Sequence, residues 1–312
     1  MFYIENEERD IETITLKEFE KSCHVELVQE NTSGTMQLST VNVNRPGLLL
    51  AGFEDYFGDK RIQVIGNAES WYLESVSKEE KKQKLISLFK RKIPCVILTR
   101  GIEPCDIIKQ VAKEYDVPLF KSDMNTSQLV NELVNYLNNL LALSTSMHGV
   151  LLEVSGLGVL ITGNSGMGKS ETAMELVHRG HRLVADDNVV LKKIQGSIIG
   201  NAPEKIRHFM EIRGIGIINV QSMFGVGSVL NKKEVNLVIE LKPWSDDIEY
   251  DRLGMYDKYE NILGIDIPKL TMPVMPGRNL AIVVEVAARN QRLKKHGINA
   301  TQQLLDSINF GN

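Results

Sequence analysis

The chain has 312 residues, 43% of them hydrophobic, which is enough for two globular domains with their own cores. A formal net charge of −4 offers no basic surface for a phosphate backbone, which argues against nucleic acid as the main partner. The three cysteines lack the spacing of a zinc site or a disulfide framework, so we interpret Cys23, Cys95 and Cys105 as reduced structural thiols.

The first residues, MFYIENEERDIE, are acidic where a secretory signal is basic. No apolar run approaches the ~20 residues that a bilayer crossing needs. We therefore expect a cytoplasmic protein with no membrane partner.

Residues 1–130 alternate short apolar runs with helix-start signals, a pattern typical of a small α/β domain. Thr15 with Glu18, and Ser77 with Glu80, have capping-box spacing and predict two helix starts. No motif in this domain indicates a function.

Strands in this domain are predicted at residues 47 to 53, 61 to 66 and 94 to 99. The third of them leads through Pro104 into a predicted helix that ends before Val117.

Residues 126 to 144 predict a helix that places leucines on one stripe, namely Leu129, Leu133, Leu137, Leu140 and Leu141. The stripe is either core packing or a partner-binding surface, and its periodicity favours core packing. We expect this helix to bridge the domains, and we assign the second domain to residues 131–312.

The run from residue 148 to residue 163, HGVLLEVSGLGVLITG, contains two apolar stretches separated by a short turn. It predicts a β-hairpin whose second strand is buried and leads directly into a glycine-rich loop.

That loop, GNSGMGKS, fits G-x-x-x-x-G-K-[ST] at every fixed position and precedes the helix-forming run ETAMELVHR. Its glycines let backbone amides turn inward around a phosphate at a helix start. Lys169 supplies positive charge for the β- and γ-phosphates, and the Ser170 hydroxyl can ligate a bridging magnesium ion. The alternative is a glycine-rich turn without a ligand. The predicted ligand is Mg-ATP, held by Gly163, Asn164, Ser165, Gly166, Met167, Gly168, Lys169 and Ser170.

Residues 182 to 187, RLVADD, form a short apolar run that ends in two carboxylates, as a Walker-B-type metal ligand does. Only one helix separates Lys169 from Asp186, so we expect this strand to neighbour the loop's strand, an arrangement that resembles phosphoenolpyruvate carboxykinase. Adjacent side chains on a strand point opposite ways, so one carboxylate can serve the metal while the other takes a proton. Which of Asp186 and Asp187 does which stays open, and a simple turn is the structural alternative.

Two later segments combine glycine with charged residues. MEIRGIGIINV, residues 210 to 220, has two closely spaced glycines beside Glu211 and Arg213, which permits tight turning or close approach of a ligand. PVMPGR, residues 273 to 278, is stiffened by two prolines and can present an amide and a cation to phosphate at a helix start. Each segment can equally be a packing loop. The helix that follows is predicted to reach Lys295.

Residues 148 to about 300 resemble the catalytic domain of HPr kinase/phosphorylase, on the strength of GNSGMGKS, VADD and MEIRGIGIINV. That family phosphorylates a seryl residue of HPr, the sugar-transport phosphocarrier, and removes the phosphate with inorganic phosphate. The resemblance implies a magnesium-dependent, ATP-using homohexamer that controls carbon catabolite repression. It implies an α/β fold in two domains, a small N-terminal one and a C-terminal P-loop catalytic domain with a core like that of phosphoenolpyruvate carboxykinase.

The resemblance also implies roles for single residues. Asp187 is similar to the carboxylate that accepts the serine proton in phosphorylation and donates one in dephosphorylation, and Lys169 and His148 are similar to the family's active-site pair. Arg252, in EYDRLGMY, resembles its catalytic arginine. Without the resemblance, we would interpret His148 as structural and Arg252 as a surface residue.

Glu211 resembles a magnesium ligand of the family, in addition to Ser170. The segment tied to dephosphorylation corresponds to Pro273, Val274, Met275, Pro276, Gly277 and Arg278.

Two other functions remain open. One is a small-molecule kinase related to phosphoenolpyruvate carboxykinase. The segment MEIRGIGIINV is evidence against this alternative. The other is an ATP-sensing switch protein that transfers no phosphate. Asp187 is evidence against it, because a sensor needs a metal ligand but no positioned base.

Overall fold

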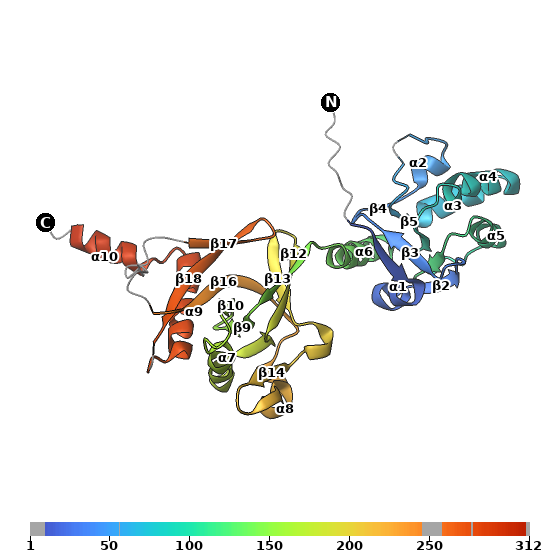
Figure 1. The fold of residues 1–312 in the computed structure, drawn as a ribbon. Coiled ribbons are helices and arrows are strands. Elements are labelled where there is room, and N and C mark those ends of the chain that lie inside the picture. Colours follow the sequence, from blue (N-terminus) through green and yellow to red (C-terminus); the bar gives the residue numbers. More distant parts are fainter. Residues whose placement is uncertain (1–9, 56, 245–257, 276, 310–312) are drawn as a thin grey trace. The chain divides into compact units, whose positions relative to one another are not determined.

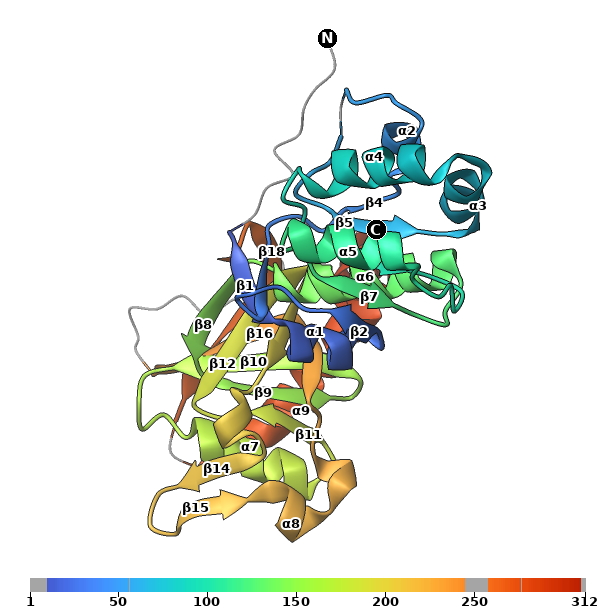
Figure 2. The same cartoon turned by 90° about the vertical axis from the view of Figure 1, so that its right-hand side faces the viewer.

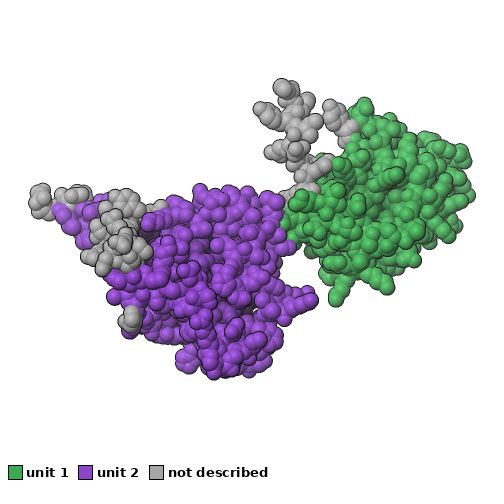
Figure 3. All heavy atoms as spheres, viewed as in Figure 1, with its two compact units in different colours: residues 1–142 green, residues 143–312 purple. Residues whose placement is uncertain are grey.

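The computed structural model describes residues 10–55, 57–244, 258–275 and 277–309. The chain forms two compact units, residues 1–142 and 143–312, and both mix helices with strands (Figures 1 and 3). Residue 130, where we placed the domain boundary, lies inside helix α6 (Thr126–Leu140), which belongs to the first unit. Among the described helices, none has the length and apolar character needed to cross a membrane.

The first unit is built on a five-stranded sheet of order β2-β7-β6-β5-β4. In this sheet β4 to β7 run parallel, and β2 pairs antiparallel with β7. The strands predicted at 61 to 66 and 94 to 99 are confirmed as β5 and β6. The strands of this unit, including a separate β1–β3 pair, are β1 (Glu12–Thr15), β2 (Glu26–Gln29), β3 (Thr35–Leu38), β4 (Val43–Asn44), β5 (Ile62–Ile65), β6 (Val96–Leu98) and β7 (Leu119–Lys121).

Two helices of the first unit, α1 and α4, start at the predicted caps. The hydroxyls of Thr15 and Ser77 each accept a hydrogen bond of 3.2 Å, from the amides of Glu18 and Glu80. The helix predicted after Pro104 is confirmed as α5. The helices before α6 are α1 (Leu16–Cys23), α2 (Gly47–Leu50), α3 (Asn67–Ser75), α4 (Lys78–Phe89) and α5 (Asp106–Glu114).

The prediction of a strand at residues 47 to 53 is wrong, because Gly47–Leu50 forms the short helix α2. Pro46 fixes a backbone angle compatible with a helix start, and its carbonyl accepts a 2.9 Å hydrogen bond from the Leu50 amide. Leu49 and Leu50 are buried while Leu48 is 70% exposed. A short apolar run does not by itself distinguish a strand from a buried helical turn.

The leucine stripe on α6 is core packing, as predicted. Leu129, Leu133 and Leu137 are fully buried beside Phe19 and Phe120 in the first unit's core. The helix therefore belongs to the first unit, and residues 141–143 continue the chain into the second.

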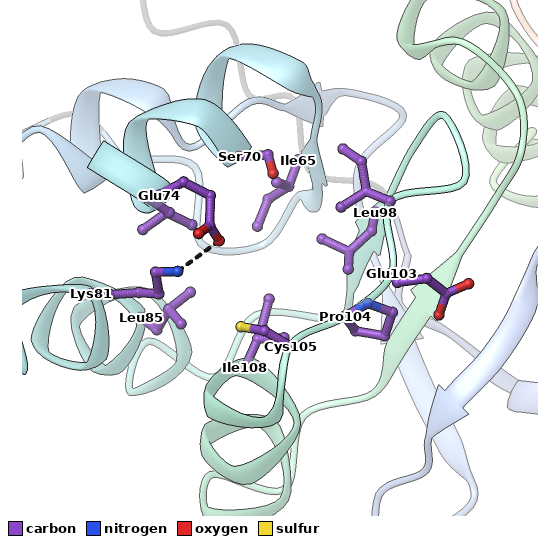
Figure 4. A pocket seen from close by; sticks show the side chains of 12 residues that line it. Ile65, Ser70, Glu74, Lys81, Leu85, Leu98, Glu103, Pro104, Cys105 and Ile108 are labelled. Atoms are coloured by element: carbon purple, nitrogen blue, oxygen red, sulfur yellow. Dashed lines mark hydrogen bonds and ion pairs between the residues drawn. The ribbon is translucent and has the colours of Figure 1, made fainter. Parts of the chain in front are cut away.

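The first unit has a small pocket, with a volume of about 40 Å³, where the carboxyl ends of β5 and β6 meet α3, α4 and α5 (Figure 4). The ammonium of Lys81 lies 2.7 Å from the Glu74 carboxylate at this pocket. Cys105 also lines it and is exposed, whereas Cys23 and Cys95 are free thiols buried in the core. The lining includes none of the residues that the sequence predicts to be functional.

The second unit contains a sheet of order β11-β9-β10-β16-β13-β12-β8, in which the later part of β16 also pairs with β18, and β18 pairs with β17. The predicted hairpin is confirmed, because β9 and β10 pair antiparallel across a turn at Ser155 and Gly156. The strands of the sheet are β8 (Ser144–His148), β9 (Val150–Val154), β10 (Leu157–Gly163), β11 (Arg182–Ala185), β12 (Asn188–Ile194), β13 (Ser197–Asn201), β16 (Lys232–Pro243), β17 (Lys258–Ile262) and β18 (Ile265–Val274).

The remaining elements of the second unit surround this sheet. A separate hairpin, β14–β15, lies beside α8 at one end of the unit (Figure 2). Helices α7 and α9 pack on one face, where they share a hydrophobic core with β9, β10 and β16. The bounds are β14 (Phe209–Ile212), β15 (Gly216–Asn219), α7 (Lys169–His178), α8 (Val220–Phe224), α9 (Leu280–Lys295) and α10 (Ala300–Asn309), with 3-10 turns at Glu204–Ile206 and Val226–Ser228.

The predicted place of the RLVADD strand is wrong. That strand, β11, pairs with β9 and does not neighbour the loop's strand β10. One edge of β10 is taken by its hairpin partner β9, and the other is paired in parallel by β16, which comes much later in the chain.

Candidate active site

The sheet brings the predicted functional segments to one edge, at the carboxyl end of β10. Strands β16 and β18 run parallel to β10, so their carboxyl ends lie at the same edge of the sheet as the glycine-rich loop (Figure 1). Strand β11 also points that way, because it is antiparallel to β9, which is antiparallel to β10. The carboxyl ends of parallel strands are where α/β proteins place their ligand sites.

The glycine-rich loop has the backbone that its sequence requires. Gly163, Gly166 and Gly168 have φ values of 136°, 83° and 82°, in the region that favours glycine. A Cβ atom on Gly163 would lie 2.5 Å from the carbonyl oxygen of Leu241 on β16. The buried Lys169 ammonium donates to the carbonyl oxygens of Gly163 at 2.9 Å and Asn164 at 3.1 Å, so its charge is held inside the curve of the loop.

Asp186 contacts the residue that ends the loop. The Ser170 hydroxyl donates to Asp186 Oδ1 at 3.1 Å, and the Glu211 amide donates to Asp186 Oδ2 at 3.1 Å. Burial raises the pKa of Asp186, although these two hydrogen bonds favour its charged form. A hydroxyl and a carboxylate oxygen suit magnesium, which takes oxygen ligands and completes its shell with phosphate and water. Ser170 and Asp186 therefore fit the metal position of an ATP site.

Asp187 contacts a different residue. His148 Nδ1 lies 3.0 Å from Asp187 Oδ1, and both side chains are exposed. Asp187 has a φ of 66°, and its carbonyl oxygen accepts a 3.1 Å hydrogen bond from the Gly149 amide. The two carboxylates thus do have different partners, but they follow β11 in a turn instead of alternating along a strand. The exposed carboxylate is the one available to a proton-donating substrate.

The hairpin β14–β15 adds contacts that our sequence interpretation did not assign. Gly214 and Gly216 make its turn with φ values of 82° and 100°. Arg213 Nη2 donates to Ser165 Oγ at 3.0 Å, so this arginine touches the phosphate-binding loop. Its place beside the glycine pair in MEIRGIGIINV is the signal that could have marked it. Glu211 has an exposed side chain, and its backbone amide binds Asp186.

The PVMPGR segment begins with Pro273 and Val274, the last two residues of β18, and ends with Arg278, just before α9. The Arg278 amide donates to Met275 O at 3.2 Å, and Arg278 Nη1 donates to Pro273 O at 3.3 Å. Gly277, with a φ of 80°, makes the turn possible. Pro276 and Arg252 lie outside the described residues.

Comparison with known proteins covers both units. The family models HPr Serine kinase N terminus and HPr Serine kinase C-terminal domain match residues 14–137 and 139–308. An HPr kinase/phosphorylase of Alkaliphilus metalliredigens is 44% identical over 96% of this chain and 97% of its own length. One of Caldanaerobacter subterraneus is 45% identical over 94% of this chain and 97% of its own length.

Among solved structures, the HPr(Ser) kinase/phosphatase of Coxiella burnetii is 41% identical, with a TM-score of 0.47, and the match covers 49% of this chain and 93% of that one. The family models and the two relatives confirm the resemblance recognised in residues 148 to 300 and extend it over the N-terminal unit. The chain belongs to the HPr kinase/phosphorylase family.

Proposed function

We propose that the protein transfers the γ-phosphoryl group of ATP to a seryl residue of the phosphocarrier HPr and removes it again by phosphorolysis. The observation that carries this proposal is that two adjacent carboxylates have different partners: Asp186 lies against Ser170 at the loop, and Asp187 lies against His148. Its family membership supplies HPr as the acceptor.

Nucleotide binding is assigned to the loop from Gly163 to Ser170. Its backbone amides and the Lys169 ammonium hold the β- and γ-phosphates at the start of α7. Ser170 and Asp186 would hold a magnesium ion, with Glu211 as a further ligand, and the ion would neutralise charge that develops on the phosphates. The Arg213 side chain, bonded to Ser165, keeps a second cation beside the loop.

Proton transfer is assigned to Asp187. In the forward direction it accepts the seryl hydroxyl proton while that oxygen attacks the γ-phosphorus and the bond to ADP breaks. In reverse, an oxygen of inorganic phosphate attacks the phosphorus of phosphoserine, the seryl oxygen leaves with the proton from Asp187, and pyrophosphate forms. His148, 3.0 Å away, orients the carboxylate in both directions.

The other family roles stay as proposals for this chain. The PVMPGR segment, from Pro273 to Arg278, would position inorganic phosphate, and Arg252 would stabilise charge on the transferred group. The core is proposed to be of the phosphoenolpyruvate carboxykinase type, which the arrival of β11 directly after α7 supports. A cytoplasmic homohexamer acting in carbon catabolite repression completes the proposal.

The test is incubation with HPr, magnesium and ATP labelled at the γ-phosphate, beside the variant Lys169→Met. The parent should place label on a seryl residue of HPr. The variant should bind nucleotide weakly and transfer nothing while its unfolding curve stays near that of the parent, because only the charge in the loop is lost. Nucleotide binding without labelled HPr would instead support the ATP-sensing switch, and label on a small molecule would support the metabolite kinase.

A further inference from the structure

Helices α7 and α9 are joined by a cluster of polar side chains on the surface of the second unit. Asn279 Nδ2 donates to Glu175 Oε1 at 2.7 Å, and Arg179 Nη2 donates to the same oxygen at 2.8 Å. Farther along, His181 Nε2 lies 2.7 Å from Glu285 Oε1. Helix α7 is therefore bonded to the start of α9 through Glu175, and the residues just after α7 are bonded to α9 through His181.

Asn279 has a special place in this cluster. It is the N-cap of α9, and its Oδ1 accepts a 3.0 Å hydrogen bond from the Ile282 amide. It also comes directly after Arg278, the last residue of PVMPGR. One side chain thus starts α9 with its oxygen and ties that start to Glu175 on α7 with its nitrogen.

The chemistry of the bond fixes its direction. The hydrogen bond from Asn279, followed by the one from Arg179, lowers the pKa of Glu175, so the carboxylate is charged and can only accept. The donor must come from residue 279. A residue that caps the helix equally well but cannot donate would break only this connection.

We propose that Asn279 and Glu175 are a positioning pair that holds Gly277 and Arg278, the end of the PVMPGR segment, at a set distance from the phosphate-binding loop, and that phosphorolysis depends on this pair more than phosphorylation does. This inference rests on the proposed function, in which that segment positions inorganic phosphate. In the forward direction the transferred group arrives on a nucleotide held by the loop itself. In reverse, a free phosphate ion must be placed against phosphoserine, and a small misplacement of reacting groups costs up to roughly 100-fold in rate.

The test variant is Asn279→Asp in the full-length protein. Aspartate caps a helix about as well as asparagine, so α9 keeps its start. It cannot donate to Glu175, and it places a second carboxylate there. The phosphorolysis rate at limiting phosphate should fall roughly 10- to 100-fold, with a raised KM for phosphate, while ATP affinity and the single-turnover kinase rate stay near the parental values.

A second substitution supplies the rescue. Adding Glu175→Gln to Asn279→Asp restores a hydrogen bond of reversed direction, because the new amide can donate to the new carboxylate, and phosphorolysis should recover. The matched control is Glu285→Gln, which alters the contacts of α9 with Arg179 and His181, just after α7, without touching Asn279. It should leave the ratio of the two rates unchanged.

A readout that does not depend on HPr separates this inference from the proposed function. Amide hydrogen exchange at Gly277 and Arg278 should be faster in Asn279→Asp and return to the parental rate in the double variant. Unchanged exchange, an equal loss in both directions, or no recovery in the double variant would overturn the positioning role. If the exchange rates respond as expected but the parent phosphorylates no HPr, the holding of the segment stands and the proposed function fails.

Discussion

Asp186 and Asp187 are neighbours in the chain but lie in different environments. Asp186 is 5% exposed and binds Ser170 and the Glu211 amide, whereas the Asp187 side chain is 72% exposed and lies against His148. A buried carboxylate beside the loop suits a metal, and an exposed one suits a substrate hydroxyl.

Asp187→Asn should therefore depress both transfer reactions by roughly 10²–10⁴-fold, the usual contribution of general acid–base catalysis. One group serves both directions, so the two losses should be similar, and nucleotide binding should survive through the loop and Lys169. Single-turnover rates in each direction, measured beside a nucleotide titration, check this expectation. An untouched rate in either direction, or a collapse of binding alone, would refute the acid–base assignment.

Glu211→Ala should raise the magnesium concentration needed for half-maximal kinase activity. The substitution removes a carboxylate but keeps the backbone amide that donates to Asp186. The contacts of Asp186 with this amide and with Ser170 should therefore stay intact. Magnesium titrations of parent and variant make the comparison, and superimposable curves would remove Glu211 from the metal site.

At the scale of elements, the order β11-β9-β10-β16-β18 explains how distant segments share one site. The sequence predicted the β9–β10 hairpin, the loop and the helix after it, because each rests on local signals such as Gly156 and the fixed loop residues. It misplaced β11, because β16, the parallel partner of β10, begins about 60 residues after the loop, and strand pairing over such a separation has no local signature. The sequence assigned no role to Arg213 for the same reason. Its contact with Ser165 depends on the β14–β15 hairpin lying against the phosphate-binding loop, which no local pattern predicts.

The parallel pairing of β10 with β16 gives a stability prediction. A Cβ atom on Gly158 would collide with the backbone carbonyl oxygen of Glu234 on β16. Gly158→Ala should lower the free energy of unfolding by about 1–3 kcal/mol or more, because rigid backbone must move apart. Gly227→Ala is the matched control, since a Cβ atom there meets nothing within 4 Å. Urea unfolding curves of the two variants test this prediction. Equal curves for Gly158→Ala and Gly227→Ala would mean that β10 and β16 can move apart at little cost in stability.

The turn between β18 and α9 gives the second prediction at this scale. Arg278→Ala should impair phosphorolysis more than phosphorylation, because a guanidinium at this turn can hold the attacking phosphate. Its present hydrogen bond to Pro273 O, at 3.3 Å, is long, so the side chain has little to lose by turning to a ligand. Parallel assays of the two directions test the expectation, and equal losses would indicate that Arg278 only stabilises the turn.

At the scale of the whole molecule, the two units differ in how much their sequences reveal. The sequence of the second unit indicated a function because its glycines, Lys169 and two carboxylates have the spacing that phosphate binding, metal binding and proton transfer require. For the first unit the sequence indicated only an α/β fold. Its apolar pattern marks residues of the core, such as Leu129 and Phe120, which have no reactive or ligand-binding groups. The family model that matches residues 14–137, and a relative that is 44% identical over 96% of the chain, assign the first unit to the family, which its local sequence patterns did not do.

The claim that one site runs phosphoryl transfer in both directions is tested most directly by the fate of a labelled phosphoryl group. HPr carrying labelled phosphoserine is mixed with the parent protein and with Asp187→Asn, with and without unlabelled inorganic phosphate. The parent should release the label as pyrophosphate only when phosphate is present, and Asp187→Asn should slow this reaction and the kinase reaction alike, by roughly 10²–10⁴-fold. Release of the label as free phosphate whether or not phosphate is added, or phosphorolysis that persists in a variant without kinase activity, would contradict the account.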